Sequence, residues 1–255
     1  VYSAGVAGRA YASVGPGGRT RVPPPPGART MPGAMALNAV IVPVTPFQQN
    51  CSVAWCDATG DGAVIDPGGD LDQVLAAAAA NGVRIARILV THAHIDHAGA
   101  TAELARRLGV PVEGPQREEQ FWIDQLPAQG RMFGLPPGEA FVPDRWLEDG
   151  DTCTVGNERF EVYHCPGHTP GHVVFFNRAG RVAFVGDVLF AGSIGRTDFP
   201  RGDYATLVRS ITGKLWPLGD DVTFVPGHGP TSTFGAERRS NPFVGDAALR
   251  RADRA

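Results

Sequence analysis

Four short apolar runs in this sequence each lead into a loop that combines glycine or proline with histidine or aspartate. The runs and their loops are "RILV" before "THAHIDHAG", "VYHC" before "PGHTPGH", "AFVG" before "DVLF", and "TFV" before "PGHGP". Short runs rich in β-branched and aromatic residues, bounded by turn residues, indicate strands. Because strands fix the residues at their ends and loops let those residues converge, the pattern predicts stacked sheets with a ligand-rich edge.

The densest of these loops, "THAHIDH", holds three of the seven histidines within six positions, with Asp96 between His94 and His97. In an extended or looped segment, residues 92, 94 and 96 project to one side, whereas a helix would place His92 and His94 nearly opposite each other. We therefore expect an extended or looped segment here. Imidazole nitrogens and carboxylate oxygens are ligands that zinc prefers, and three protein ligands with a water molecule leave an open position for chemistry.

The full set of candidate ligands comprises five histidines and two aspartates, namely His92, His94, Asp96, His97, His168, Asp187 and His228. This number exceeds the needs of one tetrahedral site, so we expect two metal ions that share a bridging carboxylate and a bridging hydroxide. The other two histidines, His164 and His172, are interpreted as structural or surface residues outside the site.

The composition divides the chain into two parts. Residues 1–35 are rich in glycine, proline, alanine and arginine, without apolar periodicity, which predicts a disordered leader or upstream sequence. Residues 36–255 are predicted to form a single metallo-hydrolase domain. The net charge is −3, and the first 35 residues contain arginines but no acids, so the rest of the chain is more acidic still. This balance predicts no nucleic-acid partner.

Membrane insertion is also not expected, because no apolar run approaches the roughly 20 residues that a spanning helix needs. The four cysteines contain no CxxC pair and are too few for a disulfide scaffold at this length. We interpret them as reduced thiols, which predicts a cytoplasmic protein.

The order of the expected elements is that of an α/β protein. An antiparallel meander is predicted at 38–44, 51–56 and 62–65, followed by a helix over 70–82 with Asp70 as its N-cap and Asn81-Gly82 as its stop. The remaining strands are expected at 84–90, 111–114, 151–155, 158–165, 171–177, 181–187 and 221–225. The remaining helices are expected at 99–110, 114–126 and 203–218, and the proline-rich stretch 127–146 is predicted to be an irregular lid or substrate wall.

The motifs "THAHIDH", "PGHTPGH", "GDVLF" and "PGHGP", preceded by "VIDPGG", resemble the successive motifs of the metallo-β-lactamase superfamily. The resemblance is closest to its small glyoxalase II (hydroxyacylglutathione hydrolase) branch and covers about residues 38–245. It implies a four-layer αβ/βα sandwich that binds two zinc ions, with iron or manganese as alternatives in one or both sites. The implied roles are one metal on His92, His94 and His168, the other on Asp96, His97 and His228, Asp187 as the bridge, and Asp66 orienting a ligand histidine.

The ligand set favours hydrolysis of a thioester. A hydroxide between two cations is a nucleophile at neutral pH, and a thiolate, whose conjugate acid has a pKa of about 8.5, departs without a dedicated proton donor. The sequence offers no obvious separate general acid, which favours a thioester over an amide as the substrate. Asp96 and Asp187 are the predicted catalytic carboxylates. The resemblance implies a small glutathione-linked substrate such as S-D-lactoylglutathione.

The residues that would bind glutathione are less well matched. A lysine of the family that meets the glycine carboxylate of glutathione corresponds to Arg196, and a nearby tyrosine is replaced by Asp198. Arginine can grip a carboxylate with two hydrogen bonds. The alternative is that Arg196 and Asp198 pair with each other and stiffen the loop. The segment after His228 is also shorter than the helical C-terminal domain of the family.

Two other functions remain open at the level of sequence. The stretch "GRTDF" is similar to the persulfide dioxygenase branch, which would place one iron on His92, His168 and Asp187. A noncatalytic metal-binding protein is the second alternative. A lactamase is less expected, because branches with a cysteine ligand carry it where this chain has Asp187.

Overall fold

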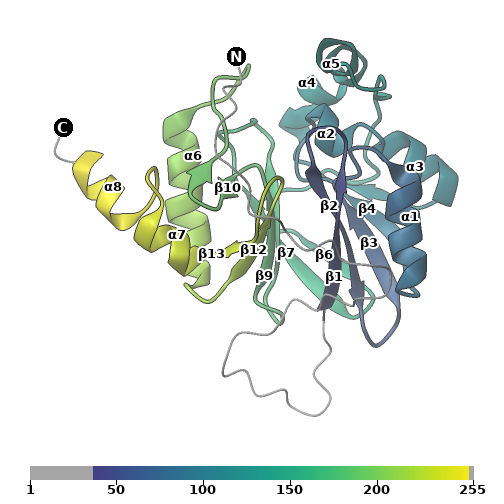
Figure 1. Ribbon diagram of the computed structural model, residues 1–255, viewed down its shortest axis with the longest axis horizontal. Coiled ribbons are helices and arrows are strands. Elements are labelled where there is room, and N and C mark those ends of the chain that lie inside the picture. Colours follow the sequence, from purple (N-terminus) through teal and green to yellow (C-terminus); the bar gives the residue numbers. More distant parts are fainter. Residues whose placement is uncertain (1–36, 253–255) are drawn as a thin grey trace.

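The computed structural model of this chain describes residues 37–252. The leader predicted at residues 1–35 lies outside the described residues. Two β-sheets face each other and helices cover their outer surfaces (Figure 1). The fold is therefore the expected four-layer αβ/βα sandwich.

The first sheet has the strand order β1-β2-β3-β4-β5. Strands β1, β2 and β3 form the predicted antiparallel meander, and β3, β4 and β5 run parallel to one another. The bounds are β1 (Leu37–Val44), β2 (Gln49–Cys56), β3 (Asp61–Ile65), β4 (Arg84–Leu89) and β5 (Val112–Glu113). Parallel neighbours need a crossover connection, and helices supply it here.

The second sheet has the strand order β13-β12-β9-β8-β7-β6 and comes entirely from the second half of the chain. Strands β9 and β12 are parallel, and the other neighbours are antiparallel. The bounds are β6 (Thr152–Val155), β7 (Glu158–His164), β8 (Val173–Asn177), β9 (Val182–Gly186), β12 (Thr223–Pro226) and β13 (Ser232–Thr233). A separate two-stranded sheet joins β10 (Leu189–Phe190) to β11 (Ser193–Ile194).

Three apolar clusters separate the layers. The central cluster lies between the sheets and includes Leu89 and Ala54 from the first sheet and Phe160, Phe175 and Phe184 from the second. A second cluster buries the inner faces of α1 (Leu71–Ala80) and α3 (Thr101–Leu108) on the first sheet, and a third buries α6 (Tyr204–Ser210) and α7 (Phe234–Ser240) on the second. Each sheet is thus apolar on both faces, as a four-layer fold requires.

Three local predictions were wrong. Asp70 precedes α1 but does not cap it with its side chain, because its backbone is left-handed (φ 48°) and its carboxylate instead accepts the backbone N–H of Thr45 at 2.7 Å. The stretch expected to be irregular begins with a helix, α5 (Leu126–Phe133), and only then becomes irregular. The helix expected over 203–218 changes type after α6 to a π-helical segment (Ile211–Leu215) and a 3-10 turn (Trp216–Leu218).

The remaining helices are short. They are α2 (Ile95–Ala98), the 3-10 turn η1 (Arg117–Glu119), α4 (Gln120–Ile123) and α8 (Asp246–Ala252). Among residues 37–252, no helix has both the length and the apolar character that crossing a bilayer would need.

Candidate metal centre

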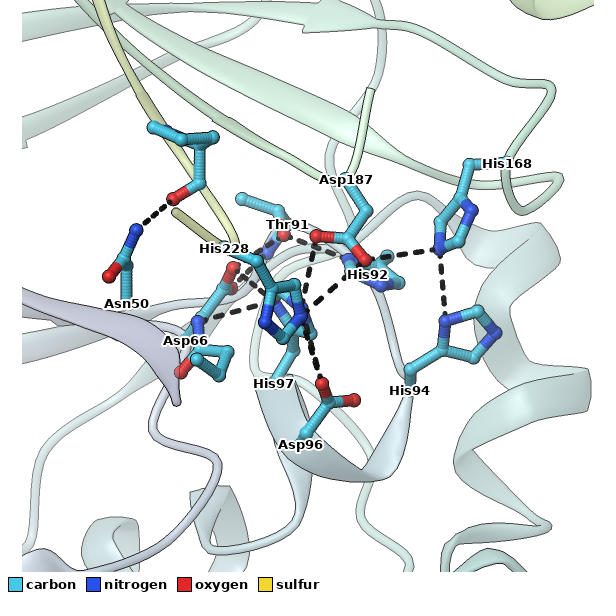
Figure 2. A network of polar contacts seen from close by, with 12 residues as sticks. Asn50, Asp66, Thr91, His92, His94, Asp96, His97, His168, Asp187 and His228 are labelled. Carbon is cyan, nitrogen blue, oxygen red and sulfur yellow. Dashed lines mark hydrogen bonds and ion pairs between the residues drawn. The ribbon is translucent and has the colours of Figure 1, made fainter. Parts of the chain in front are cut away.

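The candidate ligands meet at the edge where strands of both sheets end (Figure 2). His92 and His94 follow β4 of the first sheet, whereas His168 lies between β7 and β8 of the second. Asp187 directly follows β9, and His228 follows β12 shortly after it ends. The structure therefore brings together residues that are up to 136 positions apart, His92 and His228, as the strand-exit pattern predicted.

The conformation of the "THAHIDH" segment is only partly as expected. His92 and His94 lie in extended or irregular backbone, but Asp96 and His97 belong to the short helix α2. The prediction that residues 92, 94 and 96 share one extended segment was therefore wrong at Asp96. The helical turn after His94 directs Asp96 and His97 toward His228 instead.

Three groups of three side chains have ligand atoms close enough together to hold a metal ion, and two of them are the groups that the resemblance implies. The remaining group, Asp66, His92 and His97, shares its two histidines with these. In the first group, His92, His94 and His168 place ligand atoms within 4.8 Å of one another, and His94 Nδ1 lies 3.0 Å from His168 Nε2. In the second group, Asp96, His97 and His228 do the same, and His228 Nε2 lies 3.1 Å from Asp96 Oδ2.

Asp187 lies between the two groups (Figure 2). Its Oδ1 is 3.3 Å from His97 Nε2, and its Oδ2 is 3.6 Å from His168 Nε2 and 3.8 Å from His228 Nε2. One carboxylate oxygen is thus close to a histidine of the second group, while the other faces histidines of both. A carboxylate that bridges two cations has to lie between their ligand groups, as Asp187 does.

The outer nitrogens of three histidines fix which nitrogen faces the cluster. His168 Nδ1 is 2.7 Å from the carbonyl of Arg196, His228 Nδ1 is 3.2 Å from that of Phe47, and His97 Nδ1 is 2.9 Å from Asp66 Oδ2. Carbonyl and carboxylate oxygens only accept, so Nδ1 carries the proton and Nε2 offers its lone pair inward. Carboxylates that orient a ligand in this way are common beside metals, and Asp66 has that geometry.

Buried atoms without hydrogen bonds also fit a metal centre. Within the described residues, His92 Nε2, His97 Nε2 and Asp187 Oδ1 are buried and have no hydrogen-bond partner. Leaving such atoms unsatisfied costs about 1–3 kcal/mol each, which coordination to a cation would offset. The donor set of imidazole and carboxylate suits zinc, iron or manganese.

The two groups differ in their affinity for protons. Burial lowers the pKa of His92 well below its usual value and that of His94 to about 3, and it also lowers the pKa of His168. For His97 and His228, burial acts in the same direction, but the carboxylates of Asp187 and Asp96 outweigh it and raise their pKa values. In the absence of a cation, the histidines of the first group therefore bind protons less readily than His97 and His228 do.

Aromatic rings line the first group on its outer side. The ring centroids of Trp122 and Phe199 lie 4.7 Å and 4.9 Å from that of His94. The Arg196 guanidinium carbon lies 4.5 Å above the ring of Phe199. The guanidinium of Arg196 is thus separated from the ring of His94 by the ring of Phe199.

The side chain of Arg196 is engaged with Asp198, as the alternative interpretation expected. Its Nε donates to Asp198 Oδ1 at 2.9 Å and its Nη2 donates to Oδ2 at 2.8 Å. Both side chains are largely exposed, which places this pair in a high dielectric where it is worth little. A contact between Arg196 and a substrate stays a prediction.

His172 contributes to the site in a way that the sequence did not reveal. Its Nε2 accepts the backbone N–H of Asp187 at 3.1 Å, and its ring stacks on that of His92 with centroids 4.5 Å apart. It is fully buried, so it is not a surface residue. The signal in the sequence was its place directly before a buried strand, at the end of the second "PGH" of "PGHTPGH", but that position fits a structural residue equally well. His164, by contrast, bonds the carbonyl of Pro170 and does not join the cluster.

Residues 44–228 match the model of the metallo-beta-lactamase superfamily, and the chain belongs to this superfamily. Within it, the chain is similar to the hydroxyacylglutathione hydrolase GloC of Haemophilus influenzae, with 47% identity over 209 residues that cover 82% of this chain and 98% of that protein.

Two solved structures are similar in both sequence and fold. One is the BLEG-1 B3 metallo-beta-lactamase, with 36% identity and a TM-score of 0.75 over 81% of this chain and 99% of that chain. The other is TTHA1623 in a di-iron-bound form, with 37% identity and a TM-score of 0.73 over 80% of this chain and 99% of that chain.

Proposed function

We propose that this chain is a binuclear metal-dependent hydrolase that cleaves hydroxyacylglutathione thioesters, with S-D-lactoylglutathione as the first substrate to test. The observation that carries the proposal is the position of Asp187 within reach of two separate three-residue groups. The 47% identity to a hydroxyacylglutathione hydrolase supports the choice of substrate class.

The chain's own residues supply distinct parts of this chemistry. His92, His94 and His168 would hold one cation, the second group would hold the other, and Asp187 would bridge them. When bound, the cations would supply Lewis acidity toward a carbonyl and would lower the pKa of a coordinated water molecule. Asp66 keeps the imidazole of His97 in the tautomer that presents Nε2 to the cluster.

The leaving group fits the residues present. A thiolate needs no proton donor at neutral pH, and the titratable side chains at the centre are the candidate ligands themselves. Glutathione would lie on the side of Phe199 and Arg196, with its glycine carboxylate replacing Asp198 as the partner of the guanidinium. The partner of this enzyme is thus a small glutathione-linked thioester, with no role for nucleic acid or membrane.

The metal is proposed to be zinc, with iron or manganese as alternatives in one or both sites. The di-iron form of TTHA1623 supports including iron in the test. A cytoplasmic location stays a prediction from the four cysteines, all of which are buried and free.

Metal analysis of purified protein, paired with hydrolysis assays, tests the proposal. We expect two metal ions per chain and turnover of S-D-lactoylglutathione, with little turnover of a β-lactam such as nitrocefin. One iron per chain with oxygen uptake on glutathione persulfide would establish the dioxygenase alternative instead. Two metals with faster turnover of the β-lactam than of the thioester would also refute the proposal, and no turnover of any of the three would leave a noncatalytic metal-binding protein.

A further inference from the structure

A fully buried carboxylate, Glu119, joins the two loops that carry the first histidine group. Its Oε2 accepts the backbone N–H of Ala93 at 2.9 Å, and its Oε1 accepts that of Gly171, also at 2.9 Å. Ala93 lies between His92 and His94, and Gly171 lies three residues after His168. One carboxylate therefore holds both loops, with one oxygen for each.

The packing around Glu119 leaves no freedom for a looser arrangement. A Cβ atom on Gly171 would lie 2.7 Å from Glu119 Cγ and 2.8 Å from its backbone nitrogen, so the loop and the turn η1 are in direct contact. The backbone N–H of Gln116 also donates to the carbonyl of Gly171 at 3.0 Å. Glu119 thus lies at a fixed distance from both loops.

Burying the carboxylate of Glu119 away from water costs free energy. It has an exposure of 0%, and no ion pair joins it to a basic side chain anywhere in residues 37–252. Burial raises its pKa to about 7, so the charged form is disfavoured. A buried carboxylate stays charged only where hydrogen bonds stabilise it, and otherwise it takes up a proton. Here each of its two oxygens accepts a hydrogen bond from one backbone amide.

A second side chain of the same region holds only one of the loops. Gln129 of α5 accepts the backbone N–H of Ile95 at 3.0 Å and donates to the carbonyl of Ala93 at 3.2 Å. It therefore fixes the segment around His94. Glu119 differs in that it reaches the loop of His168 as well.

We propose that Glu119 is a positioning residue that sets the distance between the His92–His94 pair and His168, and so tunes the first metal site selectively. The proposal rests on the two-metal assignment made above. The two carboxylate oxygens accept from the backbone N–H groups of Ala93 and Gly171 and not from Asp96, His97 or His228, so the second site is expected to respond little to the removal of Glu119.

Glu119→Gln is the informative variant, because it keeps the volume but replaces one acceptor by an NH₂ group that faces a backbone donor. Glu118→Gln is the matched control. Glu118 is the neighbour of Glu119 in the sequence, its side chain is exposed, and the substitution removes a carboxylate in the same way. We would titrate each full-length protein with Zn²⁺ against a chromophoric chelator and resolve the two dissociation constants.

We expect Glu119→Gln to weaken the affinity for one of the two zinc ions by about 10-fold to 100-fold, which is the usual effect of losing a residue that positions metal ligands. The other zinc ion and both ions of Glu118→Gln should change by less than about 3-fold. Equal weakening of both ions, which a general loosening of the fold would produce, overturns the proposal, as does no change in either.

A measurement on the unaltered chain covers the case in which Glu119→Gln fails to fold. The amide protons of Ala93 and Gly171 should exchange slowly with solvent in the metal-free protein, because both are donated to a buried carboxylate. Exchange as fast as in exposed loops would overturn the proposal. This readout needs neither metal nor substrate, so it is independent of a failed thioester assay.

Discussion

At the scale of single residues, the site is defined by which atom each side chain turns inward. The carboxylate oxygens of Asp187 lie 3.3–3.8 Å from histidine nitrogens of both groups. Asp66 acts behind His97 and also accepts the backbone N–H of Thr91 at 2.7 Å. Substitutions at these two positions should therefore have different consequences.

Asp187→Asn keeps the shape of the side chain but removes its charge and one of its two acceptor oxygens. We expect it to bind one metal ion or none and to lose at least about 1,000-fold in kcat/KM, because a shared ligand serves both cations. Elemental analysis and thioester kinetics would measure this. Asp221→Asn, at an exposed ion pair with Arg181, is the control. Retention of two metals in Asp187→Asn would contradict the bridging role.

Substituting Arg196 and substituting its partner Asp198 should change KM in opposite directions. If Arg196 binds the glycine carboxylate of glutathione, Arg196→Ala should raise KM several-fold with a smaller change in kcat, since the contact is remote from the reacting carbonyl. Asp198→Ala should lower KM, because it removes the competing partner. If the pair only stiffens the loop, both variants should change KM in the same direction.

The proton affinities of the histidines predict unequal pH dependence of metal binding. His97 and His228 have raised pKa values, so a cation must displace protons from them, and its affinity should fall as the pH falls. His92, His94 and His168 have lowered pKa values and need to release none. As the pH falls below the raised pKa values of His97 and His228, the affinity for one zinc ion should weaken by up to about 10-fold per pH unit for each proton displaced, and the affinity for the other much less. Chelator titrations at each pH would show this, and parallel curves would refute it.

At the scale of elements, the short helix α2 depends on the glycine loop that follows β3. A Cβ atom on Gly68 would lie 1.5 Å from the backbone oxygen of Asp96, so the two backbones are in contact. No side chain larger than hydrogen fits there unless α2 shifts. The position of Asp96 and His97 is therefore set by a loop that holds none of the seven metal ligands expected from the sequence.

Gly68→Ala should destabilise the protein by about 1–3 kcal/mol, the usual cost of forcing extra volume into a packed site. It should also weaken metal binding at the second group. Gly213→Ala is the control, because nothing lies within 4 Å of a Cβ atom at that position. Urea unfolding of both variants would measure the difference. Equal stabilities would show that α2 yields without cost.

The same scale shows what sequence reasoning could and could not reach. Strand ends with His168, Asp187 and His228 were predictable, because apolar runs and turn residues are local signals. Three other features were not predictable. They are the helical turn at Asp96, the hydrogen bond from Thr45 N–H to the carboxylate of Asp70, and the hydrogen bonds that the Glu119 carboxylate accepts from two loops. These depend on single polar contacts between distant segments, which leave no periodic pattern in the sequence.

At the scale of the molecule, the centre joins the two halves of the sandwich. Asn50 of β2 donates through its side chain to the carbonyls of Pro226 and Gly229 at 3.0 Å and 2.9 Å, and its backbone N–H donates to the carbonyl of Gly227 at 2.7 Å. The first sheet is thus tied to the loop of His228 beside the candidate ligands. The family assignment and the four layers followed from motifs spread over both halves, whereas this tie between them became visible only in the structure.

Because ligands from both sheets converge, metal binding should stabilise the whole fold. A cation at 1,000 times its dissociation constant adds about 4 kcal/mol, and in a domain of this size each kcal/mol raises Tm by about 2–4 °C. Removing metal with a chelator should therefore lower Tm by about 10 °C, and adding Zn²⁺ should restore it. Differential scanning calorimetry would measure both steps, with Asp187→Asn as the variant that responds less. An unchanged Tm after complete metal removal would mean that the ligands are held in place by the protein alone, without help from a cation.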